Sequence, residues 1–187
     1  MVVGGPPKGR LERILLGSIA LPVVAHSRCP VIVVPTGTKV LTPRRIVVGV
    51  VGVDGSDASA RAVELALQTA EACGAAVTCV LAWNLEVDDG VVVTEPSSKR
   101  WSAVEQRYSQ LGHRTVAPVV AHHPGVDVDI VVRHGSPAKA LVEAAADLEA
   151  DLLVVGSRGR GGFTGLLLGS VSRRVLEQAN RVVAIVR

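Results

Sequence analysis

Three glycines and a serine near the carboxyl end of the chain have the types and spacing of an anion-binding loop. Gly156 and Gly159 are separated by two residues, and Gly169-Ser170 begins after nine more. Glycine lets the main chain turn sharply and approach a ligand closely, with its amide groups exposed. An apolar strand precedes the loop and a helix is predicted to begin at Gly169, and a helix N-terminus favours an anion. This arrangement predicts a bound phosphate, and hence a nucleotide.

The elements around this loop are predicted to alternate between strands and helices. Valine-rich runs indicate strands, and apolar residues at helical spacing indicate the helices between them. The expected strands are 45–53, 76–83, 126–133, 151–155 and 181–186, the expected helices are 58–73, 99–122, 137–148 and 169–179, and the stretch 84–98 is expected to be a loop. Such alternation with short connections requires a parallel sheet with right-handed crossovers.

Composition narrows the class of protein. The 187 residues have room for one ordinary domain and some extra, and 48% of them are hydrophobic. A net charge of +3 suits a small polyanionic ligand but is not the clustered basic face of a nucleic-acid binder. The apolar runs are shorter than the roughly 20 residues that cross a bilayer. We therefore expect neither a nucleic-acid partner nor a membrane partner.

The cysteines and the first residues indicate the compartment. Cys29, Cys73 and Cys79 show no metal-ligand spacing, and an odd number is poor support for a disulfide framework. The first seven residues lack the basic-then-apolar order of a secretory signal. The sequence predicts a soluble protein of the reducing cytoplasm, with no metal site.

The spacing Gly-x2-Gly-x9-Gly-Ser is similar to the ATP-binding signature of the universal stress protein family. Three more segments resemble that family in the same order: the strand 46–53 followed by Asp54-Gly55-Ser56, the segment 134–138, and the segment 152–159. Together they cover roughly residues 44–187. One departure is that the first strand carries about three more apolar residues than the family pattern, which affects the register of Asp54.

The resemblance implies a fold and the position of the site. The fold is a five-stranded parallel open sheet in the order 3-2-1-4-5, with helices on both faces. The gap between strands one and four is then the point where the strand order reverses, where open α/β sheets bind ligands. Asp54 and Gly156 would lie on opposite sides of that crevice.

The resemblance also implies roles for particular residues. Asp54 would accept hydrogen bonds from the ribose or the adenine amine, although an Asp here could equally cap the following helix. The main chain at Ala82 would meet adenine. Val132 and Gly135 would line the base or the ribose, or Gly135 would simply form a turn.

The phosphate cradle would combine main-chain amides with hydroxyl groups. Its members are Gly156, Gly159, Gly169, Ser170, Val171 and Ser172. Arg158 and Arg160 could contact the outer phosphates, or they could be solvated. The expected ligand is ATP with magnesium, and cyclic AMP, which some relatives bind, stays open.

Support for catalysis is weak. No Gly-Lys-Ser/Thr follows a glycine loop, so the lysine of the other common phosphate loop is missing. His122 and His123 would point about 100° apart on a helix, and His113 and His134 have no partner spacing. We expect no catalytic residue and at most slow hydrolysis. The predicted function is a nucleotide-responsive stress regulator; the alternatives are a nucleotide-independent dimerising adaptor and an adenylate-forming enzyme.

The N-terminal residues repeat the end of the chain. At an offset of 152 residues, Val2-Val3-Gly4 aligns with Val154-Val155-Gly156, and Gly17-Ser18 aligns with Gly169-Ser170. Eleven of the 33 pairs between Val2 and Val34 are identical. Chance similarity between two valine-rich pieces is the alternative.

The repeat predicts the organisation of the chain. Residues 1–36 would be the C-terminal remnant of a first universal stress protein domain, 37–43 a linker and 44–187 a complete domain. We expect Val31–Val34 to pair with Arg181–Arg187, within this chain as a pseudo-dimer or across a homodimer, because a strand needs a partner for its main-chain groups. The alternative is a mobile leader.

Overall fold

A computed structural model describes residues 1–4, 20–39, 42–50, 57–84, 86–88, 90–158 and 168–187. The predicted site residues Asp54 and Gly159 lie outside these ranges, as do Arg160 and the repeated pair Gly17-Ser18. Within the described part of the chain, no helix is both long enough and apolar enough to span a membrane.

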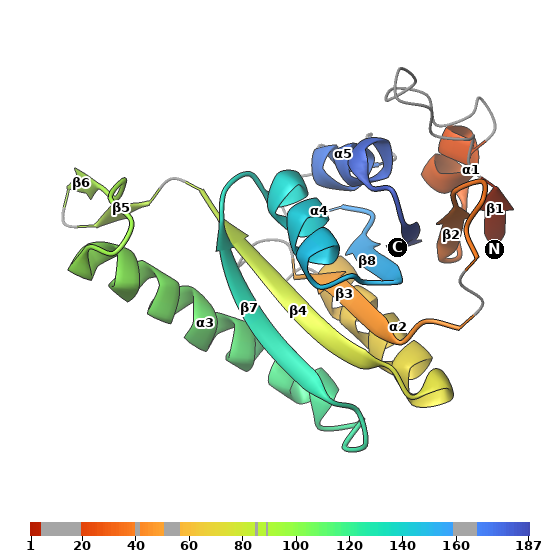
Figure 1. The fold of residues 1–187 in the computed structure, drawn as a ribbon, viewed down its shortest axis with the longest axis horizontal. Helices are drawn as coiled ribbons and strands as arrows, with labels where there is room; N and C mark the ends of the chain where they lie inside the picture. The colour runs from red at the N-terminus through yellow and green to blue at the C-terminus, as the bar shows by residue number, and fades with distance from the viewer. Residues whose placement is uncertain (5–19, 40–41, 51–56, 85, 89, 159–167) are drawn as a thin grey trace.

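Strands and helices alternate through most of the described chain (Figure 1). The strands are β1 (Val2–Gly4), β2 (Val31–Val34), β3 (Arg45–Gly49), β4 (Ala76–Trp83), β5 (Val87–Asp88), β6 (Val91–Val92), β7 (Val128–His134), β8 (Leu152–Gly156) and β9 (Val182–Val186). The helices are α1 (Ala20–His26), α2 (Asp57–Cys73), α3 (Lys99–Val120), α4 (Pro137–Asp147) and α5 (Ser170–Gln178).

Local sequence signals account for several of these bounds. Ser98 caps α3, because its hydroxyl accepts the Trp101 N–H at 3.1 Å. Pro137 stands in the first turn of α4, where its missing N–H costs nothing. Gly74, with φ of +69°, follows the last residue of α2.

Seven strands form one mixed sheet, in the order β1-β2-β9-β8-β3-β4-β7. The run β9-β8-β3-β4-β7 is parallel throughout, and it contains the predicted order 3-2-1-4-5. The prediction of a five-stranded parallel sheet is nevertheless wrong in extent and direction. β2 joins β9 antiparallel and β1 joins β2 parallel, because the outer edge of β9 supplies the partner that β2 needs.

The expected pairing of Val31–Val34 with the last strand is therefore present within the chain. Its register is also symmetric with respect to the repeat. In β2–β9, Val31 lies opposite Ile185, Ile32 opposite Ala184 and Val33 opposite Val183. In β1–β2, residues Val2, Val3 and Gly4 lie opposite Ile32, Val33 and Val34. The residues 152 positions later pair in the same way in β8–β9, where Val154, Val155 and Gly156 lie opposite Ala184, Ile185 and Val186.

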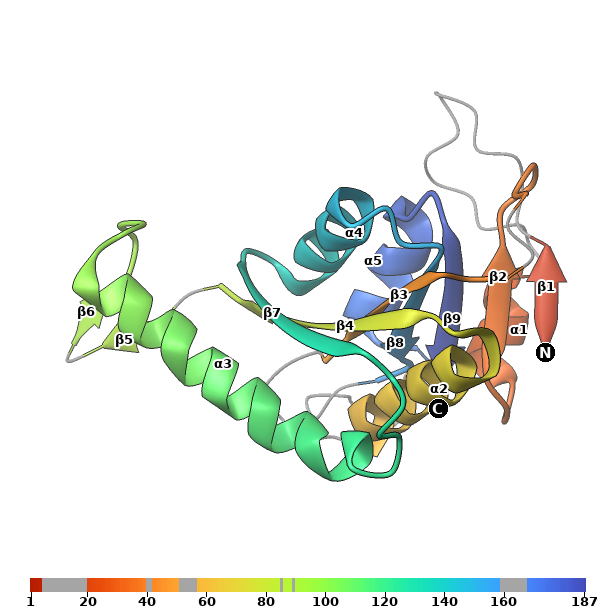
Figure 2. The ribbon, with the colours of Figure 1, turned by 60° about the horizontal axis from the view of Figure 1, so that its bottom comes forward.

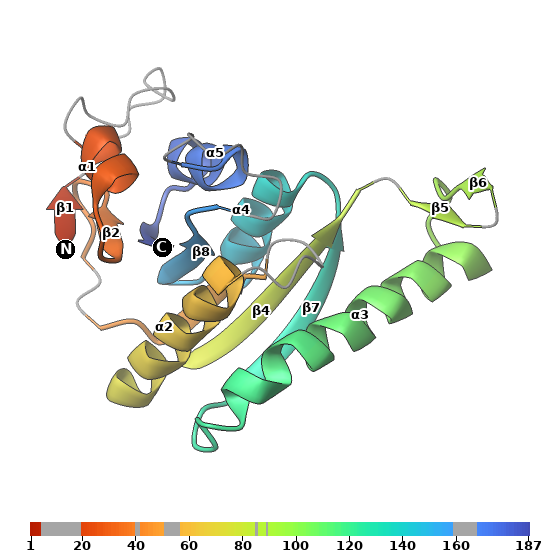
Figure 3. The ribbon, with the colours of Figure 1, turned by 180° about the vertical axis from the view of Figure 1, so that it is seen from behind.

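Helices cover both faces of the sheet. One apolar cluster joins one face to α1, α4 and α5, represented by Val24, Leu141 and Val175. A second cluster joins the other face to α2 and α3, represented by Leu67 and Val116. Figure 2 shows α4 and α5 across the sheet from α2, and Figure 3 shows α2 and α3 from behind. The valine-rich strands lack clean alternation because both of their faces are covered.

The stretch 84–98, predicted to be a loop, contains the hairpin of β5 and β6. Val87 lies opposite Val92, and the Val93 N–H donates to Glu86 O at 2.9 Å. The prediction of a loop is therefore wrong at these residues. Strands of two residues are too short to show the alternation of apolar and polar residues by which a strand is predicted. The first strand of the complete unit was expected to reach residue 53; β3 ends at Gly49, and residues 51–53 lie outside the described part.

Candidate functional site

The predicted site lies where β3 and β8 run side by side in the middle of the sheet. They are parallel, with Gly49 opposite Val155, so their carboxyl ends meet at the same edge. The helix after β3, α2, covers one face, whereas the helix after β8, α5, covers the other. A divergence of this kind opens a crevice outside the carboxyl ends of the strands.

Gly156, the last residue of β8, lies against the first turn of α2. A Cβ atom at this position would be 3.0 Å from the carbonyl oxygen of Ala58 and 3.1 Å from its carbonyl carbon. Main-chain atoms cannot swing aside as the end of a long side chain can, so the position strongly favours glycine. This contact places the loop after β8 next to the N-terminus of α2, the helix that follows Asp54 in the sequence.

Ser157 is fixed on both sides by main-chain hydrogen bonds. Its N–H donates to Val186 O at 2.5 Å, and its carbonyl oxygen accepts the N–H of Gly169 at 2.7 Å. The chain thus leaves the sheet at Ser157 and returns to the same point twelve residues later. The hydrogen bond between Gly169 and Ser157 therefore brings the two ends of the predicted phosphate loop together.

Gly169 places the N-terminus of α5 against this closure. A Cβ atom on Gly169 would lie 3.1 Å from Ser157 O and 3.4 Å from the Cα of Arg158. The residue is the N-cap of α5, and no side-chain hydrogen bond from the described residues caps the helix. The amides of the first turn are therefore available to an acceptor, and that turn carries no acidic residue to repel an anion.

The serines of this turn have different environments. Ser170, the first residue of α5, is exposed. Ser172 is 3% exposed, and its hydroxyl donates to the carbonyl oxygens of Gly156, at 2.7 Å, and Ser157, at 3.1 Å. The Ser172 hydroxyl therefore holds the start of the loop onto α5, whereas its amide and that of the half-buried Val171 belong to the open first turn.

The residues predicted for the base side lie at the carboxyl ends of β4 and β7. Ala82 is opposite Arg133, and Val132 is opposite Leu81. The Gly135 N–H donates to Trp83 O at 2.7 Å, and its φ of +131° is one that other residues rarely adopt. The structure thus brings Ala82, Val132 and Gly135 together on neighbouring strands, on the β3 side of the crevice.

An aromatic cluster beside these residues is not predicted by the sequence. The rings of Trp83, Trp101 and His134 lie with centroids 4.6 Å apart in each pair. Tyr108 stacks near Trp83 and donates to Glu86, and burial raises the pKa of its hydroxyl to about 12, with the Glu86 bond adding to the shift. The concentration of aromatic residues between positions 83 and 108, in a chain with only 2% aromatics, is the signal that could have found it.

Charged groups near the loop are mainly basic. Arg158 is exposed and follows the fixed residue Ser157. Arg173 and Arg174 lie on α5, where Arg173 pairs with Glu177 at 2.9 Å. No group of three or more His, Cys, Asp or Glu side chains suited to a metal ion occurs among the residues that the structure describes.

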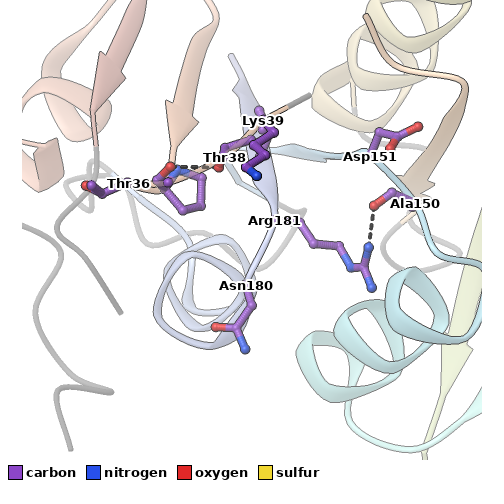
Figure 4. A pocket seen from close by; sticks show the side chains of 10 residues that line it. Thr36, Thr38, Lys39, Ala150, Asp151, Asn180 and Arg181 are labelled. Atoms are coloured by element: carbon purple, nitrogen blue, oxygen red, sulfur yellow. Dashed lines mark hydrogen bonds between the residues drawn. The ribbon is translucent and has the colours of Figure 1, made fainter. Parts of the chain in front are cut away.

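A separate pocket of about 400 Å³ lies at the opposite ends of β8 and β9 (Figure 4). It is lined by Pro35–Lys39 after β2 and by Ala150, Asp151 and residues 180–182. Its polar groups contact nearby main chain: Thr38 donates to Pro35 O at 2.7 Å and Arg181 to Ala150 O at 2.6 Å. The first bond closes a turn within the segment after β2, and the second joins the residues that precede β9 and β8, at the end remote from Gly156.

The fold defines a class of α/β protein with a parallel core sheet covered by helices on both faces and glycines at both ends of the connection between β8 and α5. The model of the "Universal stress protein family" matches residues 1–35 and 44–187. The chain therefore belongs to the universal stress protein family. The match in two parts corresponds to the N-terminal segment and the larger remainder.

Curated relatives match over the whole chain. A universal stress protein of Mycobacterium tuberculosis is 37% identical over 187 residues, which are 100% of this chain and 61% of the relative. One of Mycolicibacterium smegmatis is 36% identical over the same share of each. The chain thus spans about three-fifths of the length of these relatives.

Solved structures share the fold. One, of a universal stress protein in complex with cAMP, is 30% identical, with a TM-score of 0.55 over 78% of this chain and 98% of that one. A universal stress protein from Archaeoglobus fulgidus, 22% identical, matches 100% of this chain and 59% of its own, with a TM-score of 0.65. The latter likeness concerns the fold alone.

Proposed function

We propose that this protein is an ATP-binding universal stress protein and a nucleotide-responsive stress regulator. The observation that carries the proposal is the hydrogen bond from the Gly169 N–H to Ser157 O, 2.7 Å long. This bond brings the two ends of the loop together at the N-terminus of α5, whose first-turn amides have no side-chain cap among the described residues. At Gly156 and Gly169 a Cβ atom would meet main chain. This donor set, amides without side chains around them, suits a phosphate chain.

Each part of the nucleotide has a proposed partner. The phosphates would accept from the amides of the first turn of α5 and of Gly159, with Arg158 near the outer phosphates and magnesium shared among their oxygens. The adenine would lie toward the carboxyl ends of β4 and β7, at Ala82, Val132 and Gly135. Asp54 would contact the ribose. Ser172 would act through the loop, since its hydroxyl is bonded to Gly156 and Ser157.

The proposal includes at most slow hydrolysis. The titratable side chains that directly follow Ser157 or stand on the first turns of α5 are Arg158, Arg173 and Arg174. A guanidinium stays protonated and cannot take a proton from water. The site would therefore hold ATP for much longer than a turnover enzyme does, which suits a regulator.

We also propose that residues 1–36 are the C-terminal part of a first universal stress protein domain, with 37–43 as linker and 44–187 as the complete one. The identical registers of β1–β2 and β8–β9 at an offset of 152 residues support this organisation. The antiparallel pair β2–β9 would make the chain a pseudo-dimer, in place of a homodimer through the same strands.

Cyclic AMP is a second candidate ligand. It is favoured by the structure of a relative with 30% identity that is described as a complex with cAMP. A cyclic monophosphate has no outer phosphates, so Arg158 would make no contact with it. A nucleotide-independent adaptor that uses the β2–β9 region is the third candidate.

Mass spectrometry of the nucleotide released on denaturing the purified protein tests the proposal, together with calorimetric titrations of ATP with magnesium and of cyclic AMP. We expect ATP to be released or bound, and the assembly state to change with it. Binding of cyclic AMP alone would favour the second candidate. The absence of heat for either ligand at about 1 mM, a weak-binding limit, would reject a nucleotide site. Assembly unchanged by replacing both Gly159 and Gly169 would favour the adaptor.

A further inference from the structure

The position of the phosphate loop depends on the end of β9. Ser157, the first residue after β8, donates its N–H to the carbonyl oxygen of Val186, the last residue of β9. The carbonyl of the same Ser157 receives the N–H of Gly169. A displacement of Val186 therefore moves the residue on which both ends of the loop converge.

The end of β9 is held in turn by the N-terminal segment, defined as the described residues 1–4 and 20–35. β2 pairs with β9 from Val183 to Ile185. The side chain of Arg187, directly after β9, donates to the carbonyl oxygen of Ala25 in α1. The strand that positions Ser157 is thus bonded on its outer side to β2 and, beyond its last residue, to α1.

Apolar packing connects the same parts. Val24 of α1 and Val31 and Val33 of β2 belong to the buried cluster that contains Val175 and Leu176 of α5. The two apolar residues that flank Gly169-Ser170, which are Leu168 and Val171, pack against this cluster. The N-terminal segment therefore supports both β9 and the helix whose N-terminus would face the phosphates.

We infer that docking of the N-terminal segment and binding of nucleotide are energetically coupled through β9. The inference rests on the proposed nucleotide site and adds its regulation: the segment is a positioning element of the loop. By linkage, if docking tightens nucleotide binding by some factor, nucleotide must strengthen docking by the same factor. A partner that displaced β2 from β9 would release nucleotide.

Amide hydrogen exchange by NMR measures the coupling in the full chain. Saturating ATP with magnesium should slow exchange of the amides in the β2–β9 ladder about fivefold or more, the lower end of usual couplings. Amides at the amino ends of β4 and β7, near the pair Val77 and Val128 and remote from the proposed adenine contacts, serve as the internal control. Bound ATP with an unchanged β2–β9 ladder would overturn the inference.

Arg187→Ala tests the path from the other end. We expect its affinity for ATP to fall about fivefold or more, and Arg187→Lys, which keeps a donor for Ala25 O, to restore part of it. Arg45→Ala is the matched control, because Arg45 also donates to a carbonyl oxygen at the C-terminal end of a helix, Leu148 O at 3.2 Å, but at the opposite end of the sheet. Equal losses for Arg187→Ala and Arg45→Ala would contradict the coupling.

The same variants separate this inference from the proposed function. If the wild-type chain bound no nucleotide, the proposed function would fail, and the part of the inference left to test would be that the N-terminal segment positions the loop. In that case Arg187→Ala should speed exchange of the Ser157 and Gly169 amides about threefold or more, as expected for a loosened local unit, and Arg45→Ala should not. Unchanged exchange at these two amides would reject the inference.

Discussion

Ile32 lies opposite Ala184 in the antiparallel pair β2–β9, and these two residues are also equivalent positions of the internal repeat, 152 residues apart. A residue that pairs with its own equivalent marks a local twofold axis. The repeated segments therefore meet as two halves of a symmetric junction, although they belong to one chain. This relationship supports the proposed domain organisation more directly than sequence identity does, because chance similarity would not fix the register.

Replacing Gly156 should weaken nucleotide binding with a smaller effect on folding. In Gly156→Ala the new Cβ would be forced against the main chain of Ala58, 3.0 Å away, and the loop would separate from α2. We expect ATP affinity to fall at least about tenfold, which corresponds to about 1.4 kcal/mol. Calorimetry measures the loss. Gly125→Ala, at a position where a Cβ meets nothing within 4 Å, is the control.

Gly135→Ala should reduce stability through the main chain and not through crowding. The Cβ of an alanine would have open space, but the φ of +131° would be strained. We expect the free energy of unfolding to fall by about 1–3 kcal/mol, measured by denaturant titration. A variant as stable as Gly125→Ala would show that the conformation is relaxed easily.

His123 should make stability depend on pH. Its Nδ1 lies 3.0 Å from a Glu71 oxygen and its Nε2 lies 3.2 Å from a Glu64 oxygen. The bond to Glu71 contributes most to raising the pKa of His123, and Glu64 adds to it, whereas burial opposes the shift. The stabilisation is therefore complete below the unfolded pKa of about 6.5 and is lost as pH rises through the higher folded pKa.

Denaturant titrations across this range test the sign. The difference in unfolding free energy between wild type and His123→Gln should shrink as pH rises from about 6.5. His113→Gln, at an exposed position of α3, controls for histidine titration in general. A difference that grows with pH would contradict the prediction.

The three cysteines should react with a thiol reagent at very different rates. Cys29 is exposed, and its hydrogen bond with Ser27 lowers the pKa of its thiol. Cys79 is buried, and burial raises its pKa to about 12, with Asp129 adding to the shift. Since the thiolate is the reactive form, Cys29 should be modified first and Cys79 last.

Alkylation of the native protein, followed by peptide mass spectrometry, gives the order. Ser27→Ala should slow the reaction of Cys29 and leave Cys79 unaffected, because only Cys29 bonds that hydroxyl. Modification of Cys79 at a rate close to that of Cys29 would mean that the second apolar cluster opens readily.

Much of the fold follows from local signals in the sequence. The valine-rich runs and the spacing of Gly156 and Gly169 predict the parallel core and the turn between β8 and α5, since both are properties of short segments. The direction in which β2 joins β9 could not be predicted this way, because an isolated run of valines is equally suited to parallel and antiparallel pairing. The two-residue strands β5 and β6 are shorter than the period of any pattern.

Some features of the candidate site could likewise be predicted from the sequence, and others could not. The sequence predicts that Ser170 and Ser172 lie near the phosphate loop, but it does not predict where the Ser172 hydroxyl points. That direction depends on the carbonyl of Gly156, sixteen positions earlier and brought close only by the packing of α5 on the sheet. The contacts of His123 with Glu64 and Glu71 similarly join the segment after α3 to α2, and no local pattern specifies the relative placement of these two parts.

The reversal of direction between β2 and β9 also determines where the repeated turns can act. β1 is antiparallel to β8, so Gly4 and its equivalent Gly156 end their strands on opposite rims of one sheet. A molecule assembled from two complete copies in this way would be bipolar, with its ligands facing away from each other. Any communication between those ligands would have to travel along the shared sheet and could not come from direct contact.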